Sequence, residues 1–206
     1  MARLQGLTPD EARRFRTGRP CLDLAHSGGD GPYAVFELLH TAPDVSRWLG
    51  VIADLDDIEA DESSVHAGRA LRRAIWHTAH RAIEGDPPTD RDRKIINAAA
   101  AAPPPIPILG RSGRATTRRP LTAAQVLSVL ARDAVNLFGG PLADRIRVCA
   151  ASDCGLLYVD QSRTGNRQWC SMQRCGTRAK VRSHRERRTQ PSSLVPGTGP
   201  DRDDMG

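Results

Sequence analysis

Four of the five cysteines lie within 27 residues, in the spacing C-x4-C-x15-C-x4-C. They are Cys149, Cys154, Cys170 and Cys175. Four thiolates fill the tetrahedral sphere of a zinc ion and leave no position for water, so the pattern predicts one closed, structural zinc site. Reduced thiols in an apolar core are a weaker alternative because this segment has few apolar residues. An iron–sulfur cluster would more often use a tighter Cys-x2-Cys run.

The segment that carries these cysteines is also strongly basic. The whole chain has a net charge of +6, from 30 Lys and Arg against 24 Asp and Glu. Residues 145–188 alone contain eleven Lys and Arg and three acidic residues, so the rest of the chain is slightly acidic. Positive charge gathered in one module favours a polyanionic partner such as nucleic acid.

The chain between the two cysteine pairs has the pattern of a strand. In the run GLLYVDQS, Leu157 and Val159 fall on one face and Leu156 and Tyr158 on the other. A strand at this position would lead away from the first cysteine pair, so a return strand is needed to bring the second pair back to it.

The residues that follow complete the expected finger. A turn over residues 163–167 leads to Trp169, which we expect on the return strand covering the metal. Ser171 is a good cap for a helix that begins just after Cys170 and carries Cys175. Knuckle, hairpin and basic helix in this order predict a small treble-clef-like zinc finger over residues 141–189.

Arginines crowd the helix expected after Cys175. Like charges at i and i+4 destabilise an isolated helix, so this density indicates a polyanion that compensates it. The spacing puts Arg178, Arg182 and Arg185 near one face that could enter the major groove of DNA, whereas Lys180 and Arg187 would meet phosphates. The candidate nucleic-acid contacts are Arg163, Arg167, Arg174, Thr177, Arg178, Lys180, Arg182, His184, Arg185, Arg187 and Arg188.

Double-stranded DNA is the partner that the residues favour, and two others stay open. A single strand of RNA could stack on Trp169 and Tyr158. Alternatively, the basic finger could dock on an acidic surface of another protein and act as an adaptor. The leading hypothesis is therefore a zinc-dependent, DNA-binding transcription regulator.

The residues before the finger predict a mainly α domain over residues 1–140. Aromatic residues make up only 4% of the chain, so its core must rest on Leu, Ile, Val and Ala, which favours packed helices. Ser63 or Ser64 is expected to cap a long helix that ends near Glu84. The outward side of this helix is predicted to carry Arg69, Arg72 and Arg73.

Other segments of this domain are predicted from caps and breakers. A short helix is expected at residues 9–15, and an extended segment with a turn at residues 18–31. Asp90 is expected to cap a helix that ends near residue 102, and Thr122 to open one that ends near Phe138. The residues between these two helices, 106–120, form either a hairpin or a loop.

A few other side chains in this domain could carry chemistry. Cys21 has no partner nearby, so we expect a buried, inert thiol. Asp23 and His26 are candidates for binding a small-molecule effector, although an Asp that stabilises a turn is the commoner role. His66, His77 and His80 could form a second metal site but are more simply surface histidines. No arrangement typical of catalysis stands out, so we expect that the protein is not an enzyme.

The finger resembles the CGNR zinc-finger family of bacterial proteins, which reads C-x4-C, a D-x-S-R turn, and W-C-S-M-x2-C-G-N-R before a basic helix. Here the pieces are the first cysteine pair, the turn from Asp160 to Arg163, and Trp169 to Arg178. One letter departs, because Thr177 takes the place of the family's Asn and offers a hydroxyl in place of an amide.

The stretch FRTGRPCLDLAHS is similar to the G-x-x-x-L-D-F-x-N-T stretch of the ABATE domain, which precedes this finger in the family. The resemblance implies a bacterial transcription regulator with a mainly helical N-terminal domain. In the leading hypothesis, this domain dimerises or senses a small-molecule effector. Because the first residues lack the apolar stretch of a signal peptide and no apolar run is long enough to span a membrane, we expect a cytoplasmic protein with no membrane partner. Residues 190–206 are expected to be disordered.

Overall fold

The computed structural model describes residues 8, 15, 17–29 and 31–189. The disordered tail predicted at 190–206, and the helix predicted at 9–15 apart from Phe15, lie outside the described residues. The helices are α2 (Pro20–Ala25), the 3-10 helix η2 (Gly31–Phe36), α3 (Ala42–Ala53), α4 (Glu62–Glu84), α5 (Asp90–Ala101), α6 (Ala123–Phe138), the 3-10 turn η3 (Ala143–Arg145), the π-type turn η4 (Met172–Gly176) and α7 (Thr177–Thr189). The strands are β1 (Ile58–Glu59), β2 (Pro107–Leu109), β3 (Ala115–Thr117), β4 (Leu121–Thr122), β5 (Ile146–Val148) and β6 (Leu157–Val159).

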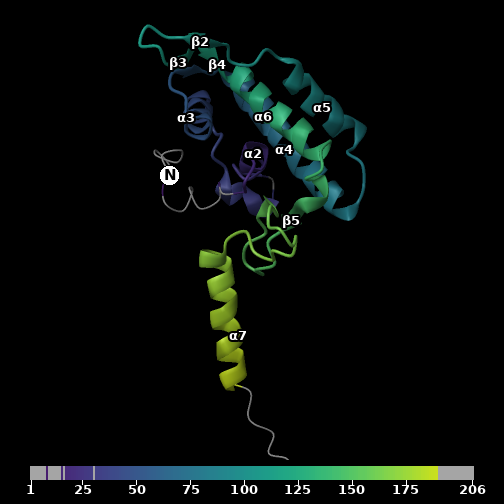
Figure 1. The fold of residues 1–206 in the computed structure, drawn as a ribbon. Helices are drawn as coiled ribbons and strands as arrows, with labels where there is room; N and C mark the ends of the chain where they lie inside the picture. The colour runs from purple at the N-terminus through teal and green to yellow at the C-terminus, as the bar shows by residue number, and fades with distance from the viewer. Residues whose placement is uncertain (1–7, 9–14, 16, 30, 190–206) are drawn as a thin grey trace, which may run out of the picture.

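Three long helices form the body of the molecule. Helices α4, α5 and α6 pack against one another, and α2 and α3 cover the side of α4 and α6 that α5 leaves open (Figure 1). The finger follows α6 and lies below this body, and α7 extends away from it (Figure 1). The predicted mainly α fold with a terminal finger is confirmed. Among the described residues, no helix combines the length and the hydropathy that a transmembrane helix needs.

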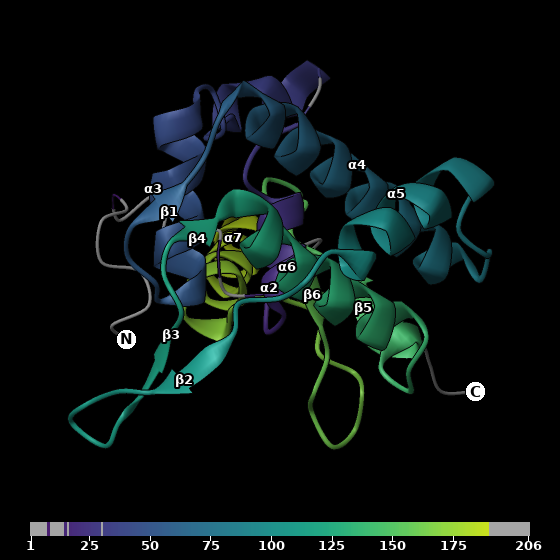
Figure 2. The same cartoon turned by 90° about the horizontal axis from the view of Figure 1, so that it is seen from above.

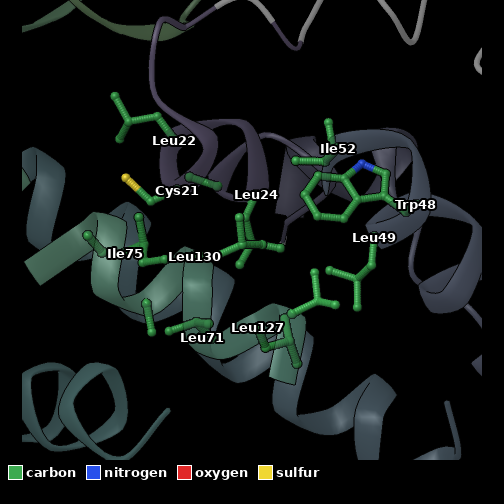
Figure 3. Close-up of a cluster of buried hydrophobic side chains, with 14 of the residues drawn as sticks. Cys21, Leu22, Leu24, Trp48, Leu49, Ile52, Leu71, Ile75, Leu127 and Leu130 are labelled. Carbon is green, nitrogen blue, oxygen red and sulfur yellow. The ribbon is translucent and has the colours of Figure 1, made fainter. Parts of the chain in front are cut away.

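The core of the body is mainly aliphatic, and the aromatic residues Phe15 and Trp48 are buried in it. Trp48 of α3 is 1% exposed, and the edge of its ring packs against Phe15 with 5.7 Å between the ring centroids. Figure 3 shows how α2, α3, α4 and α6 bring their side chains together. The residues labelled there are Cys21, Leu22, Leu24, Trp48, Leu49, Ile52, Leu71, Ile75, Leu127 and Leu130.

Side-chain caps fix where the long helices begin. Asp61 caps α4. Its carboxylate accepts a hydrogen bond from the Ser64 N–H, and the Ser64 hydroxyl oxygen accepts one from the Asp61 N–H. The predicted cap at Ser63 or Ser64 is therefore wrong by two or three residues. Thr89 caps α5, one residue before the predicted Asp90. Thr122 opens α6 as predicted, in a capping box with Gln125.

Three pairs of short strands join the helices. Strand β1 pairs with β4 in parallel, so that Ile58 lies opposite Leu121. Strands β2 and β3 form an antiparallel hairpin, which settles the choice between hairpin and loop at residues 106–120. Strands β5 and β6 form the third pair, which lies at the base of the finger.

Residues 20–25 differ from the prediction because they form a helix. Pro20 stands at the first helical position, which suits its fixed φ and missing N–H. Four of the six residues of α2 are buried between the other helices, namely Cys21, Leu22, Leu24 and Ala25. With so many buried positions, the helical period is not visible in the sequence.

The long helix α4 also differs in one outward-facing residue. Arg73 is exposed as predicted. Arg72 was also predicted to face outward, but it is only 4% exposed. Its two terminal nitrogens bind the two carboxylate oxygens of Glu37 at 2.7 and 2.8 Å. Burial is the largest single influence and would raise the pKa of Glu37, but the Arg72 hydrogen bonds, the Leu39 N–H and the charges of Arg72 and Arg69 together lower it. The ion pair fastens the segment before α3 to α4.

Candidate metal centre and basic helix

The four predicted cysteine ligands come together at one point. Each offers one Sγ, and the four sulfur atoms all lie within 4.8 Å of one another. The Cys154–Cys170 and Cys170–Cys175 sulfur pairs are 3.6 and 3.7 Å apart. Sulfurs at roughly 2.3 Å from a tetrahedral zinc ion would be separated by about 3.8 Å, so the cluster has the size that zinc requires. These cysteines hold one structural zinc ion.

The sulfur atoms also show the charge that such an ion must balance. A hydrogen bond from Cys170 is the largest of the causes that lower the pKa of Cys154. The same hydrogen bond, together with burial, raises the pKa of Cys170. Four thiolates at this spacing repel one another unless a divalent cation lies between them. The donor set therefore fits zinc chemically as well as in size.

In the hairpin at the base of the finger, strand β6 pairs with a different strand from the predicted one. Strand β6 lies where GLLYVDQS predicts it, but it pairs with β5, so that Ile146 lies opposite Val159. Trp169 is not on a strand, and it packs in the cluster around the cysteines. The alternation of Ile146 and Val148 around Arg147 is the sequence signal for β5 that the prediction missed.

Strand β6 serves two apolar clusters at once, on the faces that the sequence predicted. Leu157 and Val159 belong to the core of the helical body, whereas Leu156 and Tyr158 pack with the cysteines. The helical body and the finger are thereby joined through one strand. The predicted division at residue 140 falls in the gap between α6 and η3, and it stays a prediction.

Arg167 lies inside the finger. Its guanidinium lies 4.6 Å from the centre of the Tyr158 ring, and its Nε donates to the carbonyl of Trp169 at 2.7 Å. A second guanidinium nitrogen donates to the carbonyl of Cys170, and the Tyr158 hydroxyl donates to the carbonyl of Arg167 itself. Burial raises the pKa of Tyr158 to about 12, so this hydroxyl keeps its proton. The group clamps the chain that leads into the second cysteine pair.

The turn before Arg167 is closed by Asp160. Its carboxylate accepts from the N–H groups of Ser162 and Arg167, both at 2.9 Å. The side-chain hydrogen bond of Ser162 is the largest cause that lowers the pKa of Asp160 to about 2, and the two N–H groups add to it. Arg163 lies exposed on this turn.

The second cysteine pair opens the terminal helix, as predicted. The Ser171 hydroxyl accepts from the Arg174 N–H, and η4 carries Cys175 before α7 begins. A Cβ at Gly176 would lie 2.8 Å from the sulfur of Met172, so the flexible Met172 side chain would have to shift. The Thr177 hydroxyl donates to the Met172 carbonyl at 3.2 Å, so at the position where the family has Asn it supports the helix start.

The arginines of α7 divide between the finger and the solvent. Arg178 forms an ion pair with Asp153 at 3.0 Å and also donates to the Cys175 sulfur at 3.5 Å. Arg182 reaches the same Asp153 at 3.9 Å. Lys180 and Arg185 are exposed on the part of the helix that extends from the body (Figure 1). Arg174 is half-buried, and the side chains of His184, Arg187 and Arg188 lie outside the described residues.

Asp153 is the functional residue that sequence reasoning missed. It stands beside Cys154 in the first knuckle and contacts two helix arginines, while its neighbour Ser152 accepts from Arg182 at 2.6 Å. The sequence did contain a signal for this role. Asp153 is the single acidic residue between the first two cysteines, in a module that is otherwise strongly basic.

The predicted effector residues have structural partners. Asp23 accepts from the backbone N–H and the hydroxyl of Thr17, at 3.2 and 2.8 Å. The Nε2 of His26 accepts from the N–H of Leu157 at 2.9 Å and so joins the body to the finger. Cys21 is buried, and burial raises its pKa, as expected for an inert thiol. Within the described residues, the four-cysteine cluster is the only group that could hold a metal, so the histidine site is not supported.

Comparison with known families gives two matches to the chain. The family model ABATE, described as a putative stress-induced transcription regulator, matches residues 18–141. The model of the CGNR zinc finger matches residues 145–188. No curated protein matches the chain.

Proposed function

The chain belongs to the ABATE family and carries a CGNR zinc finger after the ABATE domain, and from this premise we propose that it regulates transcription by binding double-stranded DNA. The observation that carries the proposal is the placement of α7. Zinc fixes the base of this helix, and the helix extends from the body with exposed cationic side chains (Figure 1). A rigid basic helix of this kind fits the major groove.

The basic residues of the finger have two different roles in this proposal. Arg178 and Arg182, turned toward Asp153, hold the helix in its direction. Lys180 and Arg185, together with Arg163 on the nearby turn, supply contacts to DNA. Because four cysteines close the zinc sphere, the ion has no open position for substrate, and we propose no enzymatic activity.

RNA is disfavoured by the position of the aromatic side chains. Tyr158 is 0% exposed, so its ring is not available to a base. Trp169 is half-buried, and the edge of its ring packs beside Gly176. A stacking platform for single strands needs exposed aromatic faces.

Selection of bound fragments from a random DNA library by the zinc-loaded protein tests the proposal directly. We expect one enriched sequence, with binding that survives at physiological salt and weakens steeply as salt rises. Absence of any duplex binding above background would contradict the proposal. Preferential binding of single-stranded RNA, or of an acidic protein surface, would favour the other partners.

Charge reversal locates the contact on α7. Lys180→Glu with Arg185→Glu should weaken binding to the selected fragment and lower the salt slope by about 2, because each lost phosphate contact removes roughly 0.9. The matched control is Arg91→Glu with Lys94→Glu on exposed positions of α5, which should leave binding unchanged. Equal losses in both variants would mean that overall charge, and not α7, governs binding.

A further inference from the structure

The hairpin of β2 and β3 projects from the helical body, next to β4 and α3 (Figures 1 and 2). Its apolar side chains are in water, with Leu109 79%, Ile106 44% and Ile108 39% exposed. A two-stranded hairpin with three residue pairs is marginally stable without a covering surface. The exposed apolar side chains indicate that a partner covers it.

The hairpin is also basic and lacks neutralising partners. Residues 93–132 contain no Asp or Glu. Arg111, Arg114 and Arg118 are exposed, and none of them forms an ion pair with the rest of the described chain. A partner of this surface should therefore carry negative charge.

An acidic surface lies beside the hairpin on the same molecule. Residues 54–62 hold six Asp and Glu and no basic residue, and all six side chains are exposed. Strand β1 within this segment pairs with β4, which directly follows the hairpin. The Arg119 guanidinium donates to the carbonyl oxygens of Asp56 and Asp57. The acidic segment and the basic hairpin are thus fixed as neighbours.

We propose that the surface formed by residues 106–118 and residues 54–62 binds a second copy of this chain. Around a two-fold axis, the hairpin of each copy lies on the acidic segment of the other, so every attractive contact is made twice. Ile106, Ile108 and Leu109 then become the apolar centre of the interface, with the charges around it.

A self-complementary surface explains why a basic hairpin and an acidic segment are exposed side by side. Duplex DNA fits this surface poorly, because six carboxylates next to the hairpin would repel its phosphates. The proposed dimer does not depend on the proposed DNA binding. Its test is carried out without DNA, so either proposal can fail alone.

Sedimentation of the full-length, zinc-loaded protein over a range of concentrations and salt tests the dimer. We expect a monomer–dimer equilibrium that shifts toward the monomer as salt screens the opposite charges. A protein that stays monomeric at every concentration overturns the proposal. A dimer that does not respond to salt contradicts the charged interface.

Two charge-reversed proteins make the test specific. Arg111→Glu with Arg114→Glu and Arg118→Glu changes the charge of the hairpin from +3 to −3, so that hairpin and segment are both acidic. Asp56→Arg, Glu59→Arg and Glu62→Arg with Asp54→Asn and Asp57→Asn change the charge of residues 54–62 from −6 to +2, so that both are basic. Each protein alone should dimerise about 100-fold or more weakly, because like charges now face each other. An equimolar mixture should recover the dimer, since both contacts again join opposite charges.

The mixture separates repulsion from misfolding, because unfolded chains would not restore each other's association. Arg91→Glu, at an exposed position at the start of α5, is the control and should dimerise as the unmodified protein does. Mixed proteins that remain monomeric overturn the proposal. Reversed proteins that each dimerise normally overturn it as well.

Discussion

Arg178 and Asp153 form an ion pair, with 3.0 Å between Nη1 and Oδ2, that ties the first turn of α7 to the knuckle beside Cys154. The same guanidinium donates to the sulfur of Cys175 at 3.5 Å. Cationic hydrogen bonds to a metal-bound thiolate stabilise its charge and orient it. Arg178 is therefore a positioning residue of the zinc site.

Replacing Arg178 should weaken zinc binding before it affects anything else. We expect Arg178→Ala to lower zinc affinity by about 10- to 100-fold, the usual effect of losing a hydrogen bond to a metal ligand. Competition with a chromogenic chelator measures this. The matched control is Arg182→Ala, which loses a contact to Asp153 but none to sulfur and should bind zinc normally. Unchanged zinc affinity with weaker DNA binding in Arg178→Ala would instead make Arg178 a DNA contact.

Zinc removal should destabilise the helices as well as the finger. Leu157 and Val159 lie in the core of the helical body, and their N–H groups donate to His26 Nε2 and the Thr17 carbonyl. If the finger unfolds without zinc, these contacts are lost. Circular dichroism at a helical wavelength should then show a lower melting temperature after chelation, recovered when zinc is returned. Identical melting curves would show that the two parts are energetically separate.

The same contact can be tested without touching the metal. His26→Ala leaves the Leu157 N–H without its acceptor at a buried strand position. An unpaired buried donor costs about 1–3 kcal/mol. Chemical denaturation of the zinc-loaded protein should show this loss, whereas a protein with unchanged stability would assign the coupling to the apolar contacts alone.

Local chemistry made parts of this structure predictable from the sequence. The cysteine spacing, the cap at Thr122 and the two faces of β6 each depend on residues close together in the chain, and each is found as expected. Ser171 is a further case, because its cap on η4 follows from the residue type alone.

The misplaced predictions depend on partners that are distant in sequence. Arg72 is buried because Glu37, 35 positions earlier, reaches it with two hydrogen bonds. Strand β6 pairs with β5 because Ile146 and Leu157 are needed in the same core as the long helices. No pattern among neighbouring residues indicates such a long-range contact. The sequence therefore predicted the partner strand of β6 at the nearest candidate, Trp169.

The cap of α4 gives the protein an acid-sensitive element. Hydrogen bonds from the Ser64 and Ser63 hydroxyls and the Ser64 N–H lower the pKa of Asp61 from 3.8 to about 2. A carboxylate whose pKa is lower in the folded state contributes stability above pH 4 or so, and this contribution is lost as the pH falls toward 2. Asp61→Ala should therefore lower the melting temperature near neutral pH, with a difference that narrows below pH 4.

Thr122→Ala is the matched control for this titration, because it removes a helix cap that carries no charge. Its cost, about 1 kcal/mol, should not change with pH through a titration of its own. Thermal melting at several pH values, compared for the two variants and the unmodified protein, checks the prediction. Parallel pH profiles for the two variants would mean that Asp61 titrates alike in the folded and unfolded states.

Arg163 and Arg167 stand four residues apart on the same turn, yet they should behave in opposite ways. Arg167 is clamped by the carbonyls of Trp169 and Cys170 and by the Tyr158 ring, whereas Arg163 is exposed. Arg167→Ala should lower zinc retention and the stability of the finger. Arg163→Ala should keep both and lower the salt slope of DNA binding by about 0.9, the value for one phosphate contact.

A lysine at position 167 sharpens the comparison. Arg167→Lys keeps the charge but loses the planar fork that reaches two carbonyls, so it should resemble Arg167→Ala in zinc retention. If charge toward DNA were the role of Arg167, the lysine would restore binding. Zinc competition and DNA titration on the three variants therefore distinguish a clamp inside the finger from a contact on its surface.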